Sequence, residues 1–119
     1  MKSKSKKYIS LLDTTKDLFF KHGIKRVTIE EICKKSKVSK VTFYKYFKDK
    51  NDLIKTIRGE LMQTGFARFD EINSLSLSYP EKVEMMTSWR MEFFASMKSE
   101  FIKEIMDIDH VTEEIKERY

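Results

Sequence analysis

Hydrophobic residues recur every three or four positions through most of the chain, which is the spacing that places them on one face of an α-helix. The first such stripe consists of Tyr8, Leu11, Leu12, Thr15, Leu18 and Phe19. Lys21 and His22 follow, and basic residues suit the negative end of a helix dipole. Gly23 comes next and is a common C-terminal stop. The pattern therefore predicts a first helix over residues 7–22.

Two short helices are predicted next, over residues 28–35 and about 40–47, with a turn at 36–38 between them. Thr28 can cap the first helix, and Glu31 three residues later completes a capping box. Ser39 can cap the second helix. The apolar positions that hold the two helices together are Ile29, Ile32, Val38, Phe43 and Phe47. This arrangement is typical of a helix-turn-helix unit.

The rest of the chain also has helical spacing. Asp49 begins a long fourth helix, whose buried side is marked by Leu53, Ile54, Ile57, Leu61, Phe66, Phe69 and Ile72. Residues 73–79 read as a linker, and Pro80 fits the first position of a fifth helix. Ser99 is the predicted cap of a sixth helix. A further helical start is expected over residues 112–119.

Composition supports this helical interpretation. The 119 residues include 3 Gly and 1 Pro, so turn formers are scarce and a sheet protein is disfavoured. The single cysteine, Cys33, excludes an internal disulfide and fits a reducing cytoplasm. No segment approaches the roughly 20 apolar residues that span a bilayer. We therefore expect an all-α protein in the cytoplasm.

Charge is distributed unevenly along the chain. Residues 1–58 hold 17 Lys/Arg and 6 Asp/Glu, a net charge of +11, whereas residues 59–119 hold 7 and 13, a net charge of −6. Hydroxyl and ammonium donors are concentrated around the predicted turn and the helix after it, namely Thr28, Ser39, Lys40, Thr42, Tyr44, Lys45, Tyr46, Lys48 and Lys50. Phosphate oxygens accept hydrogen bonds and attract cations, so this half of the chain suits DNA.

Three segments carry a family resemblance: LFFKHG, VTIEEICKKSKVS and TFYKYFKDKNDLI. Over residues 8–58 they resemble a TetR/AcrR-family transcriptional regulator. The resemblance implies an all-α fold in which residues 1–48 form a three-helix DNA-binding domain. Residues 49–119 would then form a connector helix and part of a ligand-binding and dimerisation domain. Relatives continue past residue 119 and dimerise through their last two helices, so a homodimer is expected where those helices are present.

The resemblance also assigns roles to single residues. The helix over 40–47 would enter the major groove, and its base-facing candidates are Lys40, Val41, Thr42 and Lys45. The phosphate-contacting candidates are Thr28, Ser39, Tyr44, Tyr46 and Lys50. Lys50 matches the family's phosphate-binding lysine. Lys37 departs from the family, which often has Gly in the turn, and Val41 stands where a small residue is common.

Simpler explanations stand beside several of these roles. Thr28 and Ser39, taken singly, are better explained as helix caps, although one hydroxyl can serve both purposes. Met and aromatic side chains suit an adaptable apolar ligand site, and the candidates for such a site are Met86, Trp89, Phe93 and Met97. Ordinary core packing is the favoured explanation for each of them. His22 and His110 lie in no metal-spacing cluster.

The function expected from these observations is a sequence-specific DNA-binding transcriptional regulator, most often a ligand-responsive repressor that binds a palindromic operator as a dimer. Its partners would be double-stranded DNA and a small-molecule effector, and it would act in the bacterial cytoplasm at the nucleoid. The alternative is a short DNA-binding interaction module without its own effector pocket. No enzyme and no cofactor is expected, because the chain has no glycine loop for phosphates, metal cluster or paired catalytic motif.

Overall fold

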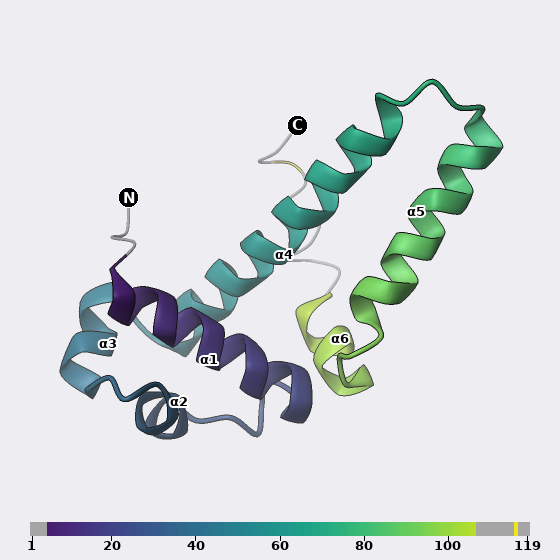
Figure 1. Ribbon diagram of the computed structural model, residues 1–119. Helices are drawn as coiled ribbons and strands as arrows, with labels where there is room; N and C mark the ends of the chain where they lie inside the picture. The colour runs from purple at the N-terminus through teal and green to yellow at the C-terminus, as the bar shows by residue number, and fades with distance from the viewer. Residues whose placement is uncertain (1–4, 107–115, 117–119) are drawn as a thin grey trace.

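The computed structural model describes residues 5–106 and residue 116, and within them it forms six α-helices (Figure 1). These are α1 (Lys6–His22), α2 (Ile29–Ser36), α3 (Lys40–Tyr46), α4 (Lys50–Asn73), α5 (Tyr79–Phe94) and α6 (Ser99–Ile105). The described residues contain no strand, as the sequence predicts. The helical start expected over 112–119 lies, apart from Lys116, outside the described residues.

The first three helices begin and end within one residue of the bounds predicted from the sequence. The Thr28 hydroxyl accepts a hydrogen bond from the Glu31 backbone N–H at 3.1 Å, which is one half of the predicted capping box. Ser39 caps α3 in the same way, accepting from the Thr42 N–H at 3.1 Å. Gly23 ends α1 with a φ of 84°, a conformation that is strained for any residue with a Cβ. These caps fix the lengths of α1–α3.

The turn between α2 and α3 contains a left-handed residue that is not glycine. Lys37 adopts φ 60° and ψ 38°, so it takes the conformation that a glycine would take here with less strain. The turn is closed by the Val38 N–H, which donates to the Cys33 carbonyl at 3.0 Å. The departure at Lys37 therefore keeps the left-handed turn and adds about 1 kcal/mol of strain to it.

The start of α5 differs from the sequence prediction. Ser78 is the N-cap, so Tyr79 is the first residue of the helix and Pro80 the second. Ser78 forms a complete capping box with Glu81: the Glu81 N–H donates to the Ser78 hydroxyl, and the Ser78 N–H donates to the Glu81 carboxylate, both at 3.3 Å. The reciprocal capping that the sequence predicted for α2 is thus complete at α5 instead, because only here does the glutamate side chain reach back.

One hydrophobic core joins α1–α4 with α6. Its fully buried side chains include Leu11, Phe19, Val27, Ile32, Phe43, Phe47, Leu53, Ile57, Phe101 and Ile105. The ring of Phe101 lies edge-on to Phe20, with centroids 5.0 Å apart, and 6.3 Å from the ring of Phe19. The predicted Ser99 cap was wrong. Lys98 precedes the helix instead, and its backbone N–H donates to the Phe20 carbonyl at 2.8 Å, which holds the start of α6 against α1.

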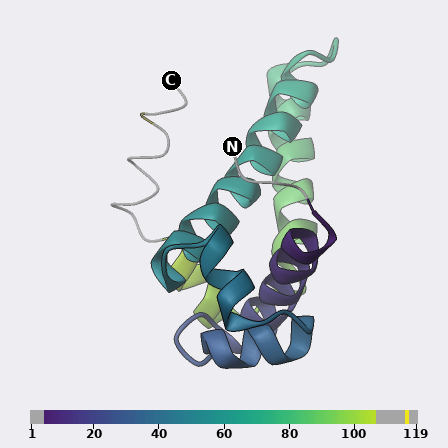
Figure 2. The same ribbon diagram turned by 90° about the vertical axis from the view of Figure 1, so that its left-hand side faces the viewer.

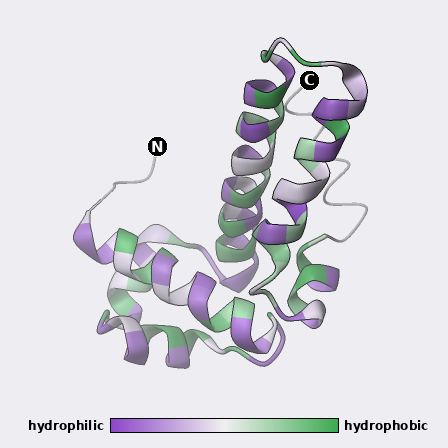
Figure 3. Ribbon diagram, turned by 45° about the vertical axis from the view of Figure 1, so that its right-hand side comes forward, coloured by the Kyte–Doolittle hydropathy of each residue, from purple (hydrophilic) through white to green (hydrophobic). Residues whose placement is uncertain are grey.

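Helices α4 and α5 form a hairpin that rises from the α1–α3 unit (Figure 2). At its base, the Lys16 ammonium and the Glu60 carboxylate lie 2.8 Å apart and join α1 to α4. Hydrophobic residues alternate with hydrophilic ones along both helices of the hairpin (Figure 3), and α5 buries none of its side chains. Phe69, predicted to lie on the buried side of α4, is 49% exposed. None of the described helices is long and apolar enough to cross a membrane.

Candidate nucleic-acid interface

Helix α3 turns one side into the core and presents the other to solvent. Phe43 is fully buried and anchors the helix, whereas Val41 is 71% exposed and Tyr44 is 51% exposed. Lys40 and Lys45 are also exposed, and Thr42 is half-buried. The base-facing residues proposed from the sequence therefore lie together on the accessible side of one short helix. This is the arrangement that contact with base edges requires.

Lys40 is held by a carboxylate from the neighbouring helix. Its ammonium lies 2.6 Å from the carboxylate of Glu30 on α2, and both side chains are more than half exposed. This hydrogen bond and the opposite charge raise the pKa of Lys40 and lower the pKa of Glu30. Water screens such a surface pair strongly, so the pair contributes little to the stability of the fold. No pattern in the sequence had pointed to Glu30.

The two tyrosines of α3 occupy different environments. The Tyr44 ring stands edge-on to Phe43, with centroids 5.1 Å apart, and its side chain is largely accessible. Tyr46 is half-buried, and its hydroxyl shares a hydrogen bond of 2.6 Å with the Ser5 hydroxyl at the start of α1. Its ring also lies edge-on to Tyr8 at 5.3 Å. Tyr46 therefore joins α3 to α1, and Tyr44 is the better placed of the two for a phosphate.

Lys50, a predicted phosphate contact, is held by a hydrogen bond within the protein. Its side chain is half-buried, and its ammonium donates a hydrogen bond of 2.7 Å to the Ile24 carbonyl in the loop between α1 and α2. Burial lowers the pKa of Lys50, and the nearby charge of Glu104 acts in the opposite direction. An ammonium has three N–H donors, so this bond leaves two for another acceptor. The sequence could not reveal the bond, because Ile24 lies 26 positions away.

A cavity of about 350 Å³ lies between α4, α5 and the end of α6. Three of the four proposed ligand-site residues, Met86, Trp89 and Phe93, line it. The rings of Trp89 and Phe93 are stacked, with centroids 4.8 Å apart. Met97 is not among the lining residues and packs against the core of the α1–α3 unit.

Sequence reasoning missed the α4 side of this cavity, above all Arg58. Arg58 is 6% exposed, lines the cavity, and donates from Nε to the Ile105 carbonyl at 3.1 Å. Its position did carry a signal, because it lies four residues after Ile54 and three before Leu61, on the apolar face of α4. A charged residue on such a face needs a buried partner, and the end of α6 supplies it.

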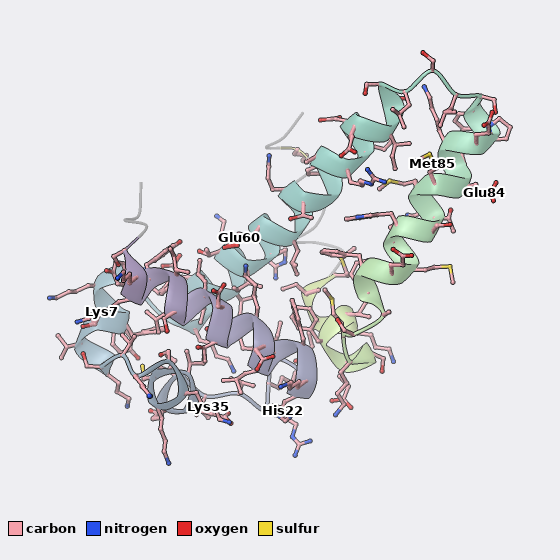
Figure 4. The ribbon with its side chains drawn as sticks, in the orientation of Figure 1. Lys7, His22, Lys35, Glu60, Glu84 and Met85 are labelled. Atoms are coloured by element: carbon pink, nitrogen blue, oxygen red, sulfur yellow. The ribbon has the colours of Figure 1, made fainter. Side chains whose placement is uncertain are left out.

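The charged side chains are distributed in the structure as in the sequence, where the first half is basic and the second half is acidic. Figure 4 shows Lys7 and Lys35 at the end of the molecule formed by α1–α3, and Glu84 on α5 in the hairpin. Within the described residues, no group of His, Cys, Asp and Glu side chains could hold a metal ion. The lysine-rich end of the molecule formed by α1–α3 therefore also contains the exposed face of α3.

Comparison with known proteins agrees with this geometry. Residues 11–57 match the model of the family described as bacterial regulatory proteins, tetR family. The fatty acid metabolism regulator protein of Bacillus subtilis (strain 168) is 26% identical over 95 residues, which are 80% of this chain and 49% of that protein. The chain spans about half the length of that relative. No solved structure matches the chain. The matched segment runs from α1 into α4 and includes all the proposed DNA-contacting residues.

Proposed function

We propose that the chain is a member of the TetR family of bacterial regulatory proteins, whose model its residues 11–57 match, and that it is a ligand-responsive repressor of transcription. Membership of that family would make it a DNA-binding transcription regulator and not an enzyme. The proposal adds that it binds a palindromic operator as a homodimer and leaves it when a small effector binds. It would act in the bacterial cytoplasm, where the operator is.

The observation that carries the proposal is the exposed face of α3. Val41 and Tyr44 are large, and the core leaves them accessible although apolar surface is normally withdrawn from water. Lys40 and Lys45 flank them. In the major groove, the Val41 methyls would contact a thymine methyl, and a lysine would donate to guanine O6 and N7. Tyr44 would donate to a phosphate and set the register of the helix.

We propose a division of labour along the chain, with residues 1–48 binding DNA and residues 49–119 forming the connector and part of the effector and dimerisation domain. Two subunits would place their α3 helices in successive major grooves, roughly 34–36 Å apart. Only a dimer with that separation fits both half-sites. An effector that favours a different separation therefore weakens binding to the operator.

The cavity between α4 and α5 supports an effector of mainly apolar character. Its volume of about 350 Å³ suits a small molecule, and its lining combines aromatic and Met side chains with Arg58 and Arg90. A hydrocarbon chain with an anionic group would match that lining. The name of the Bacillus relative connects that protein with fatty acid metabolism. We therefore propose a fatty-acid-derived effector, and the cavity favours this function over a DNA-binding module without an effector pocket.

Fluorescence anisotropy tests the proposal. DNA selected by this chain from a random pool is compared with a scrambled duplex of the same composition at physiological salt. We expect the selected duplex to bind about a thousandfold more tightly or better, and a long-chain fatty acid or its thioester to weaken that binding. Equal affinity for both duplexes would refute sequence-specific regulation. Specific binding that no acyl compound affects would refute the proposed effector class alone.

A further inference from the structure

Helix α6 is short, yet it contacts both the DNA-binding unit and the cavity. Its core residue Phe101 packs on the rings of Phe19 and Phe20 in α1. Its last residue, Ile105, lines the cavity and accepts the hydrogen bond from Arg58. Figure 1 shows α6 between the end of α1 and the lower end of α5. A displacement of α6 would therefore change its contacts with α1 and with the cavity together.

Glu104 fixes the loop between α1 and α2. Its Oε1 accepts a hydrogen bond from the Ile24 backbone N–H at 2.8 Å, and its Oε2 accepts one from the Lys25 N–H at 3.0 Å. Both carboxylate oxygens thus hold successive amides, and such charge-assisted bonds are the stronger kind. Gly23 makes room for this contact, because a Cβ there would lie 2.9 Å from Oε1.

Ile24 links Glu104 to Lys50. The N–H of Ile24 is held by Glu104, while its carbonyl accepts the hydrogen bond of 2.7 Å from the Lys50 ammonium. The Ile24 side chain is 7% exposed, so the residue is also anchored by the core. Lys50 is the first residue of α4 and follows the end of α3 by four positions. Glu104 on α6 therefore fixes the position of Ile24, and the Ile24 carbonyl in turn fixes the position of the Lys50 ammonium.

We propose that Glu104 is a positioning residue for Lys50, which it orients through Ile24 for contact with the DNA backbone. The inference rests on the proposed DNA-binding function. A free lysine side chain must be ordered when it binds a phosphate, and preorganisation removes that cost from the binding step. With one N–H on Ile24, the ammonium still offers two to phosphate oxygens. Glu104 thereby strengthens DNA binding although it carries a negative charge.

The direction in which Glu104→Gln changes the affinity for DNA distinguishes a positioning role from simple charge repulsion. Neutralising a carboxylate ordinarily strengthens binding to a polyanion, because it removes repulsion. Glu104→Gln should instead weaken binding to any duplex by about three- to tenfold. Glu100→Gln is the matched control, since it removes the same charge from the same helix. Among the residues that the structure describes, the Glu100 carboxylate pairs only with Lys98, at 3.6 Å. We expect the control to bind as tightly as the unmodified chain or slightly more tightly.

A double-mutant cycle with Lys50→Gln distinguishes an effect of Glu104 that acts through Lys50 from a general effect on the structure. If Glu104 acts through Lys50, Glu104→Gln should have no further effect on affinity once Lys50 is replaced. Nuclear magnetic resonance supplies a second readout in the free protein. Because the Glu104 charge raises the pKa of Lys50, Glu104→Gln should lower the Lys50 pKa further, and Glu100→Gln should leave it unchanged.

Each result decides one claim. Equal affinities of Glu104→Gln and Glu100→Gln, or equal losses in both Lys50 backgrounds, would overturn the positioning role. Unchanged affinity of Lys50→Gln would also overturn it, while leaving the DNA-binding function intact. A chain that binds no duplex at all would refute the proposed function and this inference with it. If Glu104→Gln does not fold, Glu104→Asp replaces it, because the shorter carboxylate cannot hold both amides.

Discussion

Replacing Phe101 with alanine should destabilise the whole unit formed by α1–α3, although Phe101 lies far outside the residues that match the family. The side chain is fully buried, and its ring is in contact distance of two aromatic rings of α1. Removing a buried phenylalanine loses its transfer free energy and leaves a cavity that rigid neighbours cannot fill, at about 3–5 kcal/mol. Globular domains have only about 5–15 kcal/mol of stability in total, so the loss is a large part of it.

Urea denaturation followed by circular dichroism measures this free energy of unfolding. We expect Phe101→Ala to lower the midpoint strongly with an unchanged slope, as when one cooperative unit is weakened. Phe69→Ala is the control, because Phe69 is 49% exposed and its loss should alter stability by less than about 1 kcal/mol. A loss at Phe101 as small as the control's, or a separate early transition that leaves α1–α3 unaffected, would refute the single shared core.

Three further predictions concern the exposed face of α3 and the turn before it. Tyr44→Phe should weaken binding to selected and scrambled duplexes alike, by about three- to tenfold through one lost phosphate hydrogen bond, whereas Lys40→Ala should alter preference at one base pair by roughly five- to a hundredfold. Anisotropy titrations against single-base variants of the selected duplex distinguish the two, and a change of base preference in Tyr44→Phe would show that the roles are assigned wrongly. Lys37→Gly should raise the free energy of unfolding by up to about 1 kcal/mol, because it relieves the left-handed strain at φ 60°; a decrease in urea denaturation would contradict that account.

The sequence predicted the local structure of α1–α3 well, because local signals determine it. The caps at Thr28 and Ser39 and the stop at Gly23 are formed by residues within a few positions of each helix end. Hydrophobic spacing then gave the core positions, and Phe43 and Phe47 are buried as expected. The start of α5 was misplaced because the Ser78 capping box lies inside a polar segment that also reads as a linker.

Contacts between residues far apart in the sequence could not be predicted from its local patterns. The spacing of residues 99–105 indicates an amphipathic helix, but nothing in it shows that Phe101 packs against α1 and not against α5. The inward bond of Lys50 depends on the Ile24 carbonyl, and the bond of Tyr46 on Ser5, 41 positions away. Such contacts are decided by which helices meet in space. The candidate site was therefore predictable as a set of residue types on α3, and much less so as a set of accessible groups.

The contacts of α6 also limit how far the protein can be shortened toward its family-matching segment. A version that ends near residue 57, where the family match stops, would lack Phe101 and would expose the rings of Phe19 and Phe20 on α1 that it covers. Such a truncated protein would tend to aggregate unless polar residues replaced the apolar side chains that become exposed on α1. Grafting the seven residues of α6 back through an artificial linker is the more economical route to a minimal folded unit.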